Sequence, residues 1–391
     1  MWLYLLIFFI PVFSYLSFYP GRNQHSSFLF LFFLGLSLFV GFSDMFGGYD
    51  RYIYGEIFDN IADVTTIKGD YSETLYYNFY SSEIGYTFLN VLISFFTENR
   101  YIFILIITLI IYICLFISLR KYTENYPLAV VLFMGLWFFF TFTYLRQVLA
   151  ATIVWLSIQY VVERKFWKFL VVFLIGFSMH NSAIIFFPLY FIPLKKFSPK
   201  LIVGVMLFLL LLGLSPLPNS LFEVYESSSI VERHAEYNAS GELRIAYILE
   251  AFFFLYLILK SYKYIPDEKS HVVLLNMALI FCGILLLFVR SENGGRLSWY
   301  YMIGIIATVT SICTYKTNIQ NKIPIFLIGL SLLLYIRIYT GWQVYLNLYP
   351  YKTFFTNGVR VGDYSWENYE YNHEYDNDKF CRKAFRFLPN L

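Results

Sequence analysis

Long apolar segments follow one another along this chain and limit it to folds in which most side chains avoid water. A helix that crosses a bilayer needs about 20 mainly apolar residues, or about 17 at the short end. Such segments span residues 2–19, 27–43, 101–119, 127–144, 147–162, 201–217, 271–289 and 297–315, with weaker or shorter ones at 245–259 and 323–337. The pattern predicts an all-α polytopic integral membrane protein with roughly 10–13 transmembrane helices.

The composition indicates the same class. Of the 391 residues, 59% are hydrophobic and only 14% are charged, whereas soluble domains carry about 25% charged residues. The net charge of +3 is too small to indicate nucleic-acid binding, so the lipid bilayer is the expected partner. The N-terminal sequence MWLYLLIFFIPVFSYLSFY lacks the basic region and the cleavage site of a signal peptide, and we interpret it as a retained membrane helix.

Two segments depart from the simple pattern of spanning helices. Residues 169–194 are long for one span and short for two, which predicts two tilted or half-length helices that meet near His180-Asn181-Ser182. Residues 84–97 are too short to span comfortably, so we expect a re-entrant or interfacial helix there.

The sequence predicts no metal and no cofactor. The four cysteines are widely spaced, and no CxxC, HExxH, P-loop or GxGxxG pattern is present. Asp376-Asn377-Asp378 imitates a DxD metal motif, but it stands in a charge-rich tail, where we interpret it as chance.

Lysine and arginine define the expected orientation. Cytoplasmic loops of membrane proteins are enriched in cations, and one set of short loops here is rich in lysine. The opposite, outer side then holds the segments 44–83, 218–244 and 290–296 and both termini. If 84–97 does span, everything before it is inverted. We divide the chain into a membrane domain, 1–338, and a polar, Tyr-rich tail, 339–391, which we expect to cap the outer face or to be partly disordered.

Arginine rather than lysine dominates the outer side. Outside the tail, the outer basic residues are Arg51, Arg100, Arg146, Arg233, Arg244, Arg290, Arg296 and, at the end of the last helix, Arg337, with Lys68 the exception. A guanidinium group offers a planar donor fork that binds phosphate bidentately. The alternative is that these arginines pair with the outer acids Asp50, Glu56, Glu83, Glu232, Glu242 and Glu292.

Two ionisable residues interrupt apolar sequence where a membrane protein could avoid them. Arg146 opens RQVLAATIVWLSIQYVV, and His180 lies inside FLVVFLIGFSMHNSAIIFFPL. A charge in hydrocarbon costs several kcal/mol unless it is paired or hydrated, so such residues indicate a functional site. Alternatively, Arg146 reaches toward lipid headgroups and His180 stabilises a helix break. Glu250, the deepest carboxylate, suits a pair with an arginine of a neighbouring helix as well as a site role.

Four short motifs occur in a fixed order in the first half of the chain. They are Gly48-Tyr49-Asp50-Arg51-Tyr52, Glu83-Ile84-Gly85-Tyr86, Arg146-Gln147-Val148-Leu149-Ala150 and Met179-His180-Asn181-Ser182-Ala183. This ordered set, over roughly residues 27–200, resembles the EpsG/Wzy-type family of exopolysaccharide and O-antigen polymerases. The rest of the chain resembles the family in hydropathy and in an Arg-containing outer turn.

The resemblance implies a glycosyltransferase of the bacterial inner (cytoplasmic) membrane, GT-C-like in architecture, that acts in lipopolysaccharide or exopolysaccharide biosynthesis. Its site would face the periplasm or cell exterior. The implied partners are undecaprenyl-diphosphate-linked oligosaccharides and a separate chain-length regulator. One lipid-linked glycan would be the donor, and a hydroxyl of a second repeat unit would displace undecaprenyl diphosphate.

That reaction suggests roles for individual residues. The leaving diphosphate needs cations, and Arg146, Arg290 and Arg296 at outer helix ends are the candidates. These arginines would replace the metal that soluble sugar-nucleotide transferases use. His180 is the first candidate for general base, with Glu83 and Asp50 as carboxylate alternatives. In the structural alternative, Glu83 caps the short helix and Asp50 is a solvated loop acid.

Three other functions remain open at the level of sequence. A lipid-linked glycan ligase would use the same donor with another acceptor. A flippase or transporter of lipid-linked sugars would carry cations along a central cavity and show internal repeats, whereas the charges here gather at one face and no repeat is visible. A membrane scaffold would give the Arg and His residues no role.

Overall fold

The computed structural model describes residues 1–17, 25–74, 83–218, 242–291, 294–315, 322–342, 348–356 and 378–387. Throughout these ranges the regular structure is helical apart from one isolated bridge between Ser43 and Thr353. The predicted all-α class is therefore confirmed. Most of the loop 218–244, as well as Glu292 and the first two residues of the Asp376-Asn377-Asp378 motif, lie outside the described residues.

Five helical stretches of the described chain are long and apolar enough to cross a membrane. They are α6 (Arg100–Tyr122), the α8–α9 pair (Leu145–Trp155 and Ile158–Val162), α14 (Lys269–Leu287), the run of α15 (Gly294–Leu297), η6 (Ser298–Tyr301) and α16 (Met302–Tyr315), and α17 (Ile323–Trp342). Shorter apolar helices are α1 (Trp2–Ser17), α2 (Ser26–Gly41), α7 (Tyr126–Leu136), α10 (Phe166–Met179), η3 (Asn181–Phe191) and α11 (Pro199–Leu214). With α13 (Ile245–Lys260), they occupy the segments that the hydropathy predicts, and the chain is a multi-pass membrane protein.

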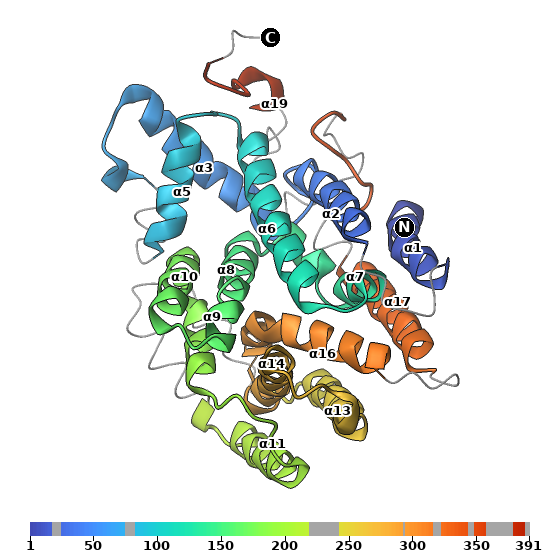
Figure 1. The fold of residues 1–391 in the computed structure, drawn as a ribbon. Coiled ribbons are helices and arrows are strands. Elements are labelled where there is room, and N and C mark those ends of the chain that lie inside the picture. The colour runs from blue at the N-terminus through green and yellow to red at the C-terminus, as the bar shows by residue number, and fades with distance from the viewer. Residues whose placement is uncertain are drawn as a thin grey trace.

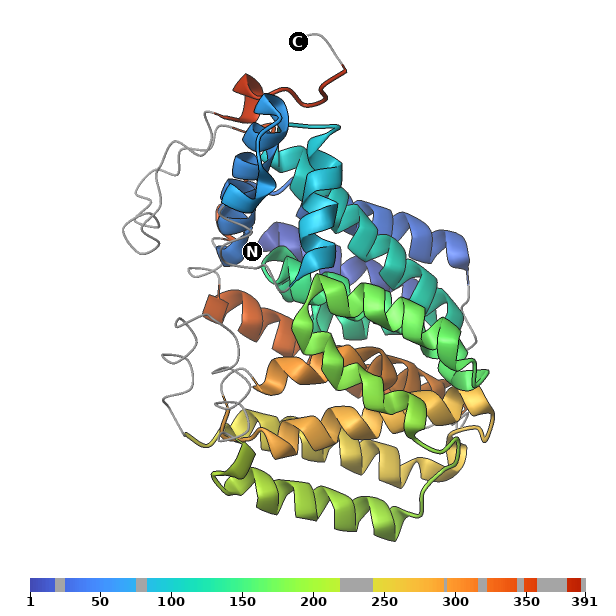
Figure 2. The same cartoon turned by 90° about the vertical axis from the view of Figure 1, so that its left-hand side faces the viewer.

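The helices form one bundle, and a pair of helices, α3 (Tyr49–Ile67) and α5 (Ile84–Ser94), lies at one end of it. Between residues 199 and 315, α11, α13 and α16 pack against α14, and the axes of these four helices are roughly aligned (Figure 2). Helices α3 and α5 stand apart from this set, with α19 (Asp378–Cys381) beside them (Figure 1). The α3–α5 pair is joined to the bundle through α6 and α10.

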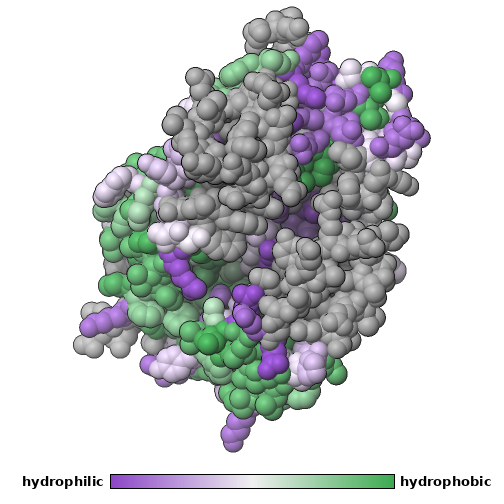
Figure 3. Space-filling model, turned by 180° about the vertical axis from the view of Figure 1, so that it is seen from behind, coloured by the Kyte–Doolittle hydropathy of each residue, from purple (hydrophilic) through white to green (hydrophobic). Residues whose placement is uncertain are grey.

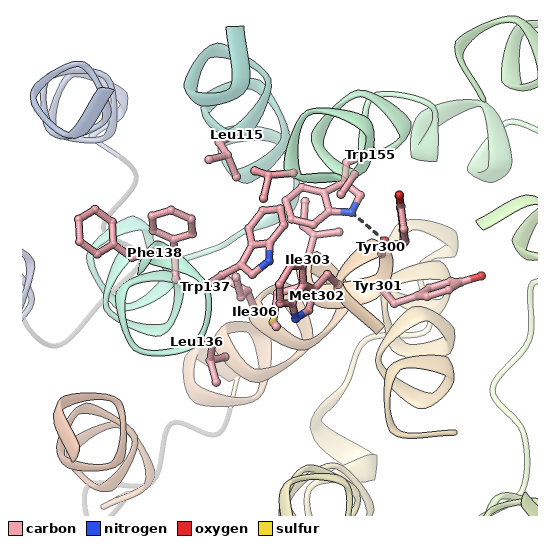
Figure 4. Packing of buried hydrophobic residues seen from close by; sticks show 14 of the residues in the cluster. Leu115, Leu136, Trp137, Phe138, Trp155, Tyr300, Tyr301, Met302, Ile303 and Ile306 are labelled. Carbon is pink, nitrogen blue, oxygen red and sulfur yellow. Dashed lines mark hydrogen bonds between the residues drawn. The ribbon is translucent and has the colours of Figure 1, made fainter. Parts of the chain in front are cut away.

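Aromatic packing holds the centre of the bundle together. Trp137, which follows α7, and Trp155 of α8 have ring centroids 5.0 Å apart, and both side chains are fully buried. The Trp155 indole donates a 2.8 Å hydrogen bond to the Tyr300 carbonyl (Figure 4). This bond fixes η6, which leads into α16, to the last residue of α8.

The outer surface of the bundle is strongly apolar. Trp2, Phe13, Leu211, Leu249 and Leu333 are each more than half exposed. Hydrophobic residues cover the lower left of the face in Figure 3, and hydrophilic ones gather at its upper right, toward the α3–α5 end. An apolar surface of this extent is stable in lipid rather than in water.

The segment around His180 breaks as the sequence predicts. Helix α10 ends at Met179, His180 is extended (φ −158°, ψ 124°), and η3 begins at Asn181. Helix α5 has 11 residues and at about 1.5 Å per residue reaches roughly half of a 30 Å hydrocarbon core. It is too short to span, as expected.

Two parts of the polar tail pack back onto the bundle. Residues 348–356 run beside the end of α2, where the Tyr351 hydroxyl donates to the Phe39 carbonyl at 2.7 Å and Asp44 N–H donates to the Lys352 carbonyl at 3.1 Å. Residues 378–387 contact α3 and the end of α5. Helix α17 continues to Trp342, past the predicted domain boundary at 338.

The two ends of the bundle carry different polar contacts. At the lysine-rich end, Lys196 donates to the carbonyls of Tyr262 and Ile265 at 3.2 and 2.8 Å, and His271 lies 3.5 Å from Glu124. The opposite end holds the starts of α3, α5 and α8 and the α10–η3 break. The sequence motifs therefore meet at one end of the bundle.

Close packing of α7 on α17 gives a test of the fold. A Cβ atom at Gly135 would lie 2.7 Å from the Cα and Cβ atoms of Ser331, whereas one at Gly35 on α2 would meet no atom within 4 Å. We expect Gly135→Ala to destabilise the protein by about 1–3 kcal/mol through overpacking. The matched change Gly35→Ala should leave the melting temperature in detergent unchanged or slightly raised. Equal melting temperatures for the two variants would contradict this packing.

Candidate functional site

Arg146 and Glu83 form an ion pair that joins α8 to α5. Arg146 is the second residue of α8, and its Nη1 contacts the carboxylate of Glu83, the residue that precedes α5. The two side chains are 14% and 7% exposed. The Arg146 guanidinium also lies 5.5 Å from the ring centroid of Tyr54, with Nε 3.5 Å from the Tyr54 hydroxyl. Because both side chains are mostly buried, water screens their mutual attraction less than it would at an exposed site.

Glu83 also reaches His180. Its Oε1 atom lies 3.6 Å from His180 Nδ1. The same Nδ1 accepts the Ser182 backbone N–H at 3.2 Å, so the neutral imidazole carries its proton on Nε2. The Ser182 hydroxyl lies 3.1 Å from His180 Nδ1 and 2.8 Å from the Tyr300 hydroxyl. The backbone N–H of Ser182, just after the helix break, thus fixes the orientation of the His180 ring.

Asp50 lies near the same group of residues, at the start of α3. Its backbone N–H donates to Thr143 Oγ1 at 3.1 Å, which fixes the start of α3 to the segment before α8. Burial raises the pKa of Asp50 to about 6, and the nearby guanidinium groups of Arg146 and Arg296 oppose that rise. Asp50 therefore lies within the field of both arginines.

Glycine 48 makes this approach of α3 to α8 feasible. Its φ of +149° is one that other residues rarely adopt, and a Cβ atom there would lie 2.3 Å from the Phe142 carbonyl oxygen. This geometry explains why a glycine stands at position 48 in the first sequence motif.

Arg296 is held by the residues that flank Arg146. Its guanidinium carbon lies 4.2 Å from the ring centroid of Tyr144, and Nη2 donates to the Tyr144 hydroxyl at 3.0 Å. The Gln147 side chain donates to the Arg296 carbonyl at 3.1 Å. Two arginines of distant parts of the chain are thus presented at the start of α8.

Arg290 differs from the other candidates. It is exposed in the turn after α14, and within the described part of the chain no contact joins it to the other five predicted site residues. The structure brings together Asp50, Glu83, Arg146, His180 and Arg296.

Two further arginines of the side predicted to be outer have structural partners. Arg51 is fully buried and donates to the carbonyls of Gly41 and Ser43 at 2.7 and 3.0 Å. Arg100 pairs with Asp59 of α3. Both arginines therefore have structural partners, but neither pairs with one of the outer acids that the sequence suggested.

Several residues of the site were not predicted from sequence. Tyr54 stands one helical turn after Asp50 on α3, and Tyr144 and Gln147 flank Arg146 closely, so helix spacing and the Arg-Gln motif were available signals. Ser182 belongs to the fourth motif. Tyr300 has no local signal, because its hydroxyl reaches Ser182 from a residue far along the chain.

The chemistry of this group suits an anion. Across the described ranges, no cluster of three or more His, Cys, Asp or Glu side chains has the geometry to hold a metal ion. Glu250 is removed from the group: it lies within electrostatic reach of Arg337 on α17. Two positioned guanidinium groups with two carboxylates and an imidazole can bind an anion and accept a proton beside it.

The chain is similar to a known protein family. The model of the EpsG family matches residues 26–353. This range contains all five gathered residues. No curated protein and no solved structure matches the chain.

The ion pair between Glu83 and Arg146 gives a stability test. Removing one partner of a buried pair leaves the other charge uncompensated, so Glu83→Gln or Arg146→Met should each destabilise the protein by about 3 kcal/mol. The double variant should lose clearly less than the sum, measured by unfolding in detergent. The exposed pair Lys165–Glu163, 53% and 44% exposed, is the control and should show a coupling of at most about 0.5 kcal/mol. Additive losses at Glu83 and Arg146 would contradict the pairing.

Proposed function

Because this chain belongs to the EpsG family, we propose that it is a glycosyltransferase that joins lipid-diphosphate-linked oligosaccharide repeat units into a polysaccharide. Family membership supports a polysaccharide polymerase role broadly. The observation that carries the finer proposal is the convergence of Arg146, Arg296, Asp50, Glu83 and His180 at one end of the bundle. Undecaprenyl diphosphate is the proposed lipid carrier.

Arg146 and Arg296 are the proposed diphosphate ligands. A guanidinium group presents its five N–H donors as a planar fork, which suits the oxygen atoms of a diphosphate. Both groups are anchored, so they need little reorganisation when negative charge develops on the leaving diphosphate. The exposed Arg290 is proposed only as an outer contact for the same anion.

The reaction is a single displacement. An acceptor hydroxyl oxygen attacks the anomeric carbon of the donor sugar while the bond from that carbon to the diphosphate oxygen breaks. Undecaprenyl diphosphate leaves with the electron pair, and the hydroxyl proton passes to a base of the protein. No metal is required, because the arginines supply the positive charge.

Asp50 and His180 are the candidates for the base. Asp50 is more basic than an ordinary aspartate, with a pKa of about 6, which suits proton transfer near neutral pH. His180 is the alternative: with the proton on Nε2, its basic nitrogen is Nδ1, which already accepts the Ser182 N–H. Glu83 pairs with Arg146, and its Oε1 atom lies 3.6 Å from His180 Nδ1, so we assign it to positioning Arg146 and to stabilising His180 when the imidazole is protonated.

The proposed location is the bacterial inner membrane, with the site at its outer face. The support is the charge distribution: the lysine-rich loops lie at the end of the bundle opposite the site. A chain-length regulator would then meet the protein from the membrane or from that outer side.

An elongation assay tests the proposal. Purified protein supplied with lipid-linked oligosaccharide alone should produce a ladder of longer glycans and release undecaprenyl diphosphate. Arg146→Ala and Arg296→Ala should each lower the rate by about 100-fold or more, while Arg290→Ala has a smaller effect. Arg120→Ala, an exposed arginine at the lysine-rich end, is the matched control and should keep the ladder. No ladder from the wild type, or an unchanged ladder from both Arg146→Ala and His180→Ala, would contradict the proposal.

The pH dependence of the same assay identifies the base. A carboxylate base acts when ionised, so the rate should rise with pH through the Asp50 pKa of about 6. The rate at pH 5 should be about one tenth of that at pH 7. The residual activity of His180→Ala should keep this acid limb, and that of Asp50→Asn should lose it. The reverse result would assign the proton to His180.

A further inference from the structure

Residues 378–387, here called the C-terminal arm, bind across the end of α3 and α5 that lies away from Asp50 and Glu83. Arg386 N–H donates to the Phe96 carbonyl at 2.9 Å, and Glu98 N–H donates to the Lys383 carbonyl at 3.4 Å. The arm therefore follows the segment after α5 with its backbone as well as with its side chains.

Arg386 joins α3 and α5 directly. Its Nε donates to the Ser94 carbonyl at 2.6 Å, and Nη2 donates to the Ala62 carbonyl at 2.9 Å. Nη1 contacts Thr66 Oγ1 at 3.0 Å and Glu98 Oε1 at 2.6 Å. Ser94 is the last residue of α5, so its carbonyl has no partner within the helix, and a cation there is favourable.

Arg382 extends the same attachment along α3. Its two Nη atoms lie 2.9 and 3.3 Å from the carboxylate oxygens of Asp63, and Nη1 lies 3.9 Å from Asp59. Its carbonyl accepts from Asn99 Nδ2 at 3.3 Å. Asp59 also pairs with Arg100, the first residue of α6, so the arm links α3, α5 and α6.

Helix α5 depends on contacts of this kind. A helix of 11 residues is marginal by itself, and Ile84 and Phe88 on its outer side are 72% and 65% exposed. At its start, α5 approaches α10 so closely that a Cβ atom at Gly85 would lie 2.1 Å from Ser178 Oγ. The arm secures the other end, and the position of Glu83 relative to Arg146 follows from both.

We propose that the C-terminal arm is a positioning element for the site, and that Arg386 is its principal positioning residue, fixing α3 with Asp50 and α5 with Glu83. This inference rests on the proposed function for its activity readout. Exposed ion pairs are individually weak, but Arg386 is only 20% exposed and bonds to the backbone of both helices.

Variants of the arm test this in the full-length protein. Arg386→Ala should lower the elongation rate by about tenfold to a hundredfold through misplacement of Glu83 and Asp50. Arg386→Lys should restore part of it, since a cation at the end of α5 is kept. Lys383→Ala, an exposed residue of the same arm, is the matched control and should retain the wild-type rate. A wild-type rate for Arg386→Ala would overturn the proposal.

A cross-link separates positioning from any other effect of Arg386. Thr65 Oγ1 and Ser94 Oγ lie 2.6 Å apart, so cysteines at both positions bring two sulfur atoms within bonding distance. In a Cys381→Ser background, Thr65→Cys with Ser94→Cys should restore the rate of Arg386→Ala when oxidised and lose it again on reduction. A full cross-link without any recovery would overturn the positioning role.

Hydrogen exchange gives a readout that does not need the reaction. In Arg386→Ala, the amides of α5 should exchange at least about tenfold faster, because the helix opens more often, while those of α14 stay unchanged. If this holds but the wild type makes no glycan ladder, the proposed function fails and the arm remains a positioning element. Unchanged exchange in α5 would overturn the proposal whatever the activity.

Discussion

The contact of one carboxylate with two basic side chains is the constraint on which the site depends. Glu83 meets Arg146 and His180, and these three residues come from the starts of α5 and α8 and from the break after α10. Each of those elements is short or interrupted. Longer, uninterrupted helices would be more stable in a membrane. The interruptions instead bring ionisable groups together, so that each of them has a partner.

Packing around this contact explains why it is rigid. Trp155 fixes η6 against α8, and Tyr300 of η6 reaches Ser182 beside the imidazole of His180. Gly48 lets α3 start against the segment before α8. The group of charged residues therefore packs against the aromatic residues around Trp155 and against the close backbone contact at Gly48. Such packing limits the movement of charged groups, as a preorganised electrostatic site requires.

Hydropathy predicts most of the fold, because each apolar segment needs only its own length and composition to be recognised. The break at His180 was predictable for the same reason. Order along the chain also predicted that Asp50, Glu83, Arg146 and His180 belong together. Partner choice was not predictable: the pairing of Arg51 with two carbonyls, of Arg100 with Asp59, and of Ser182 with Tyr300 depends on how distant segments pack. The tail was expected to cap the outer face or to be partly disordered, but its sequence did not show that residues 378–387 would bind α3.

The arm also has a consequence for the order of biosynthesis. Helices α3 and α5 leave the ribosome long before residues 378–387, with the spans from α6 to α17 made in between. The bonds of Arg386 to Ala62 and Ser94 can therefore form only after those later spans have been made. If the arm positions the site as proposed, a nascent chain would become competent only when synthesis has passed residue 386.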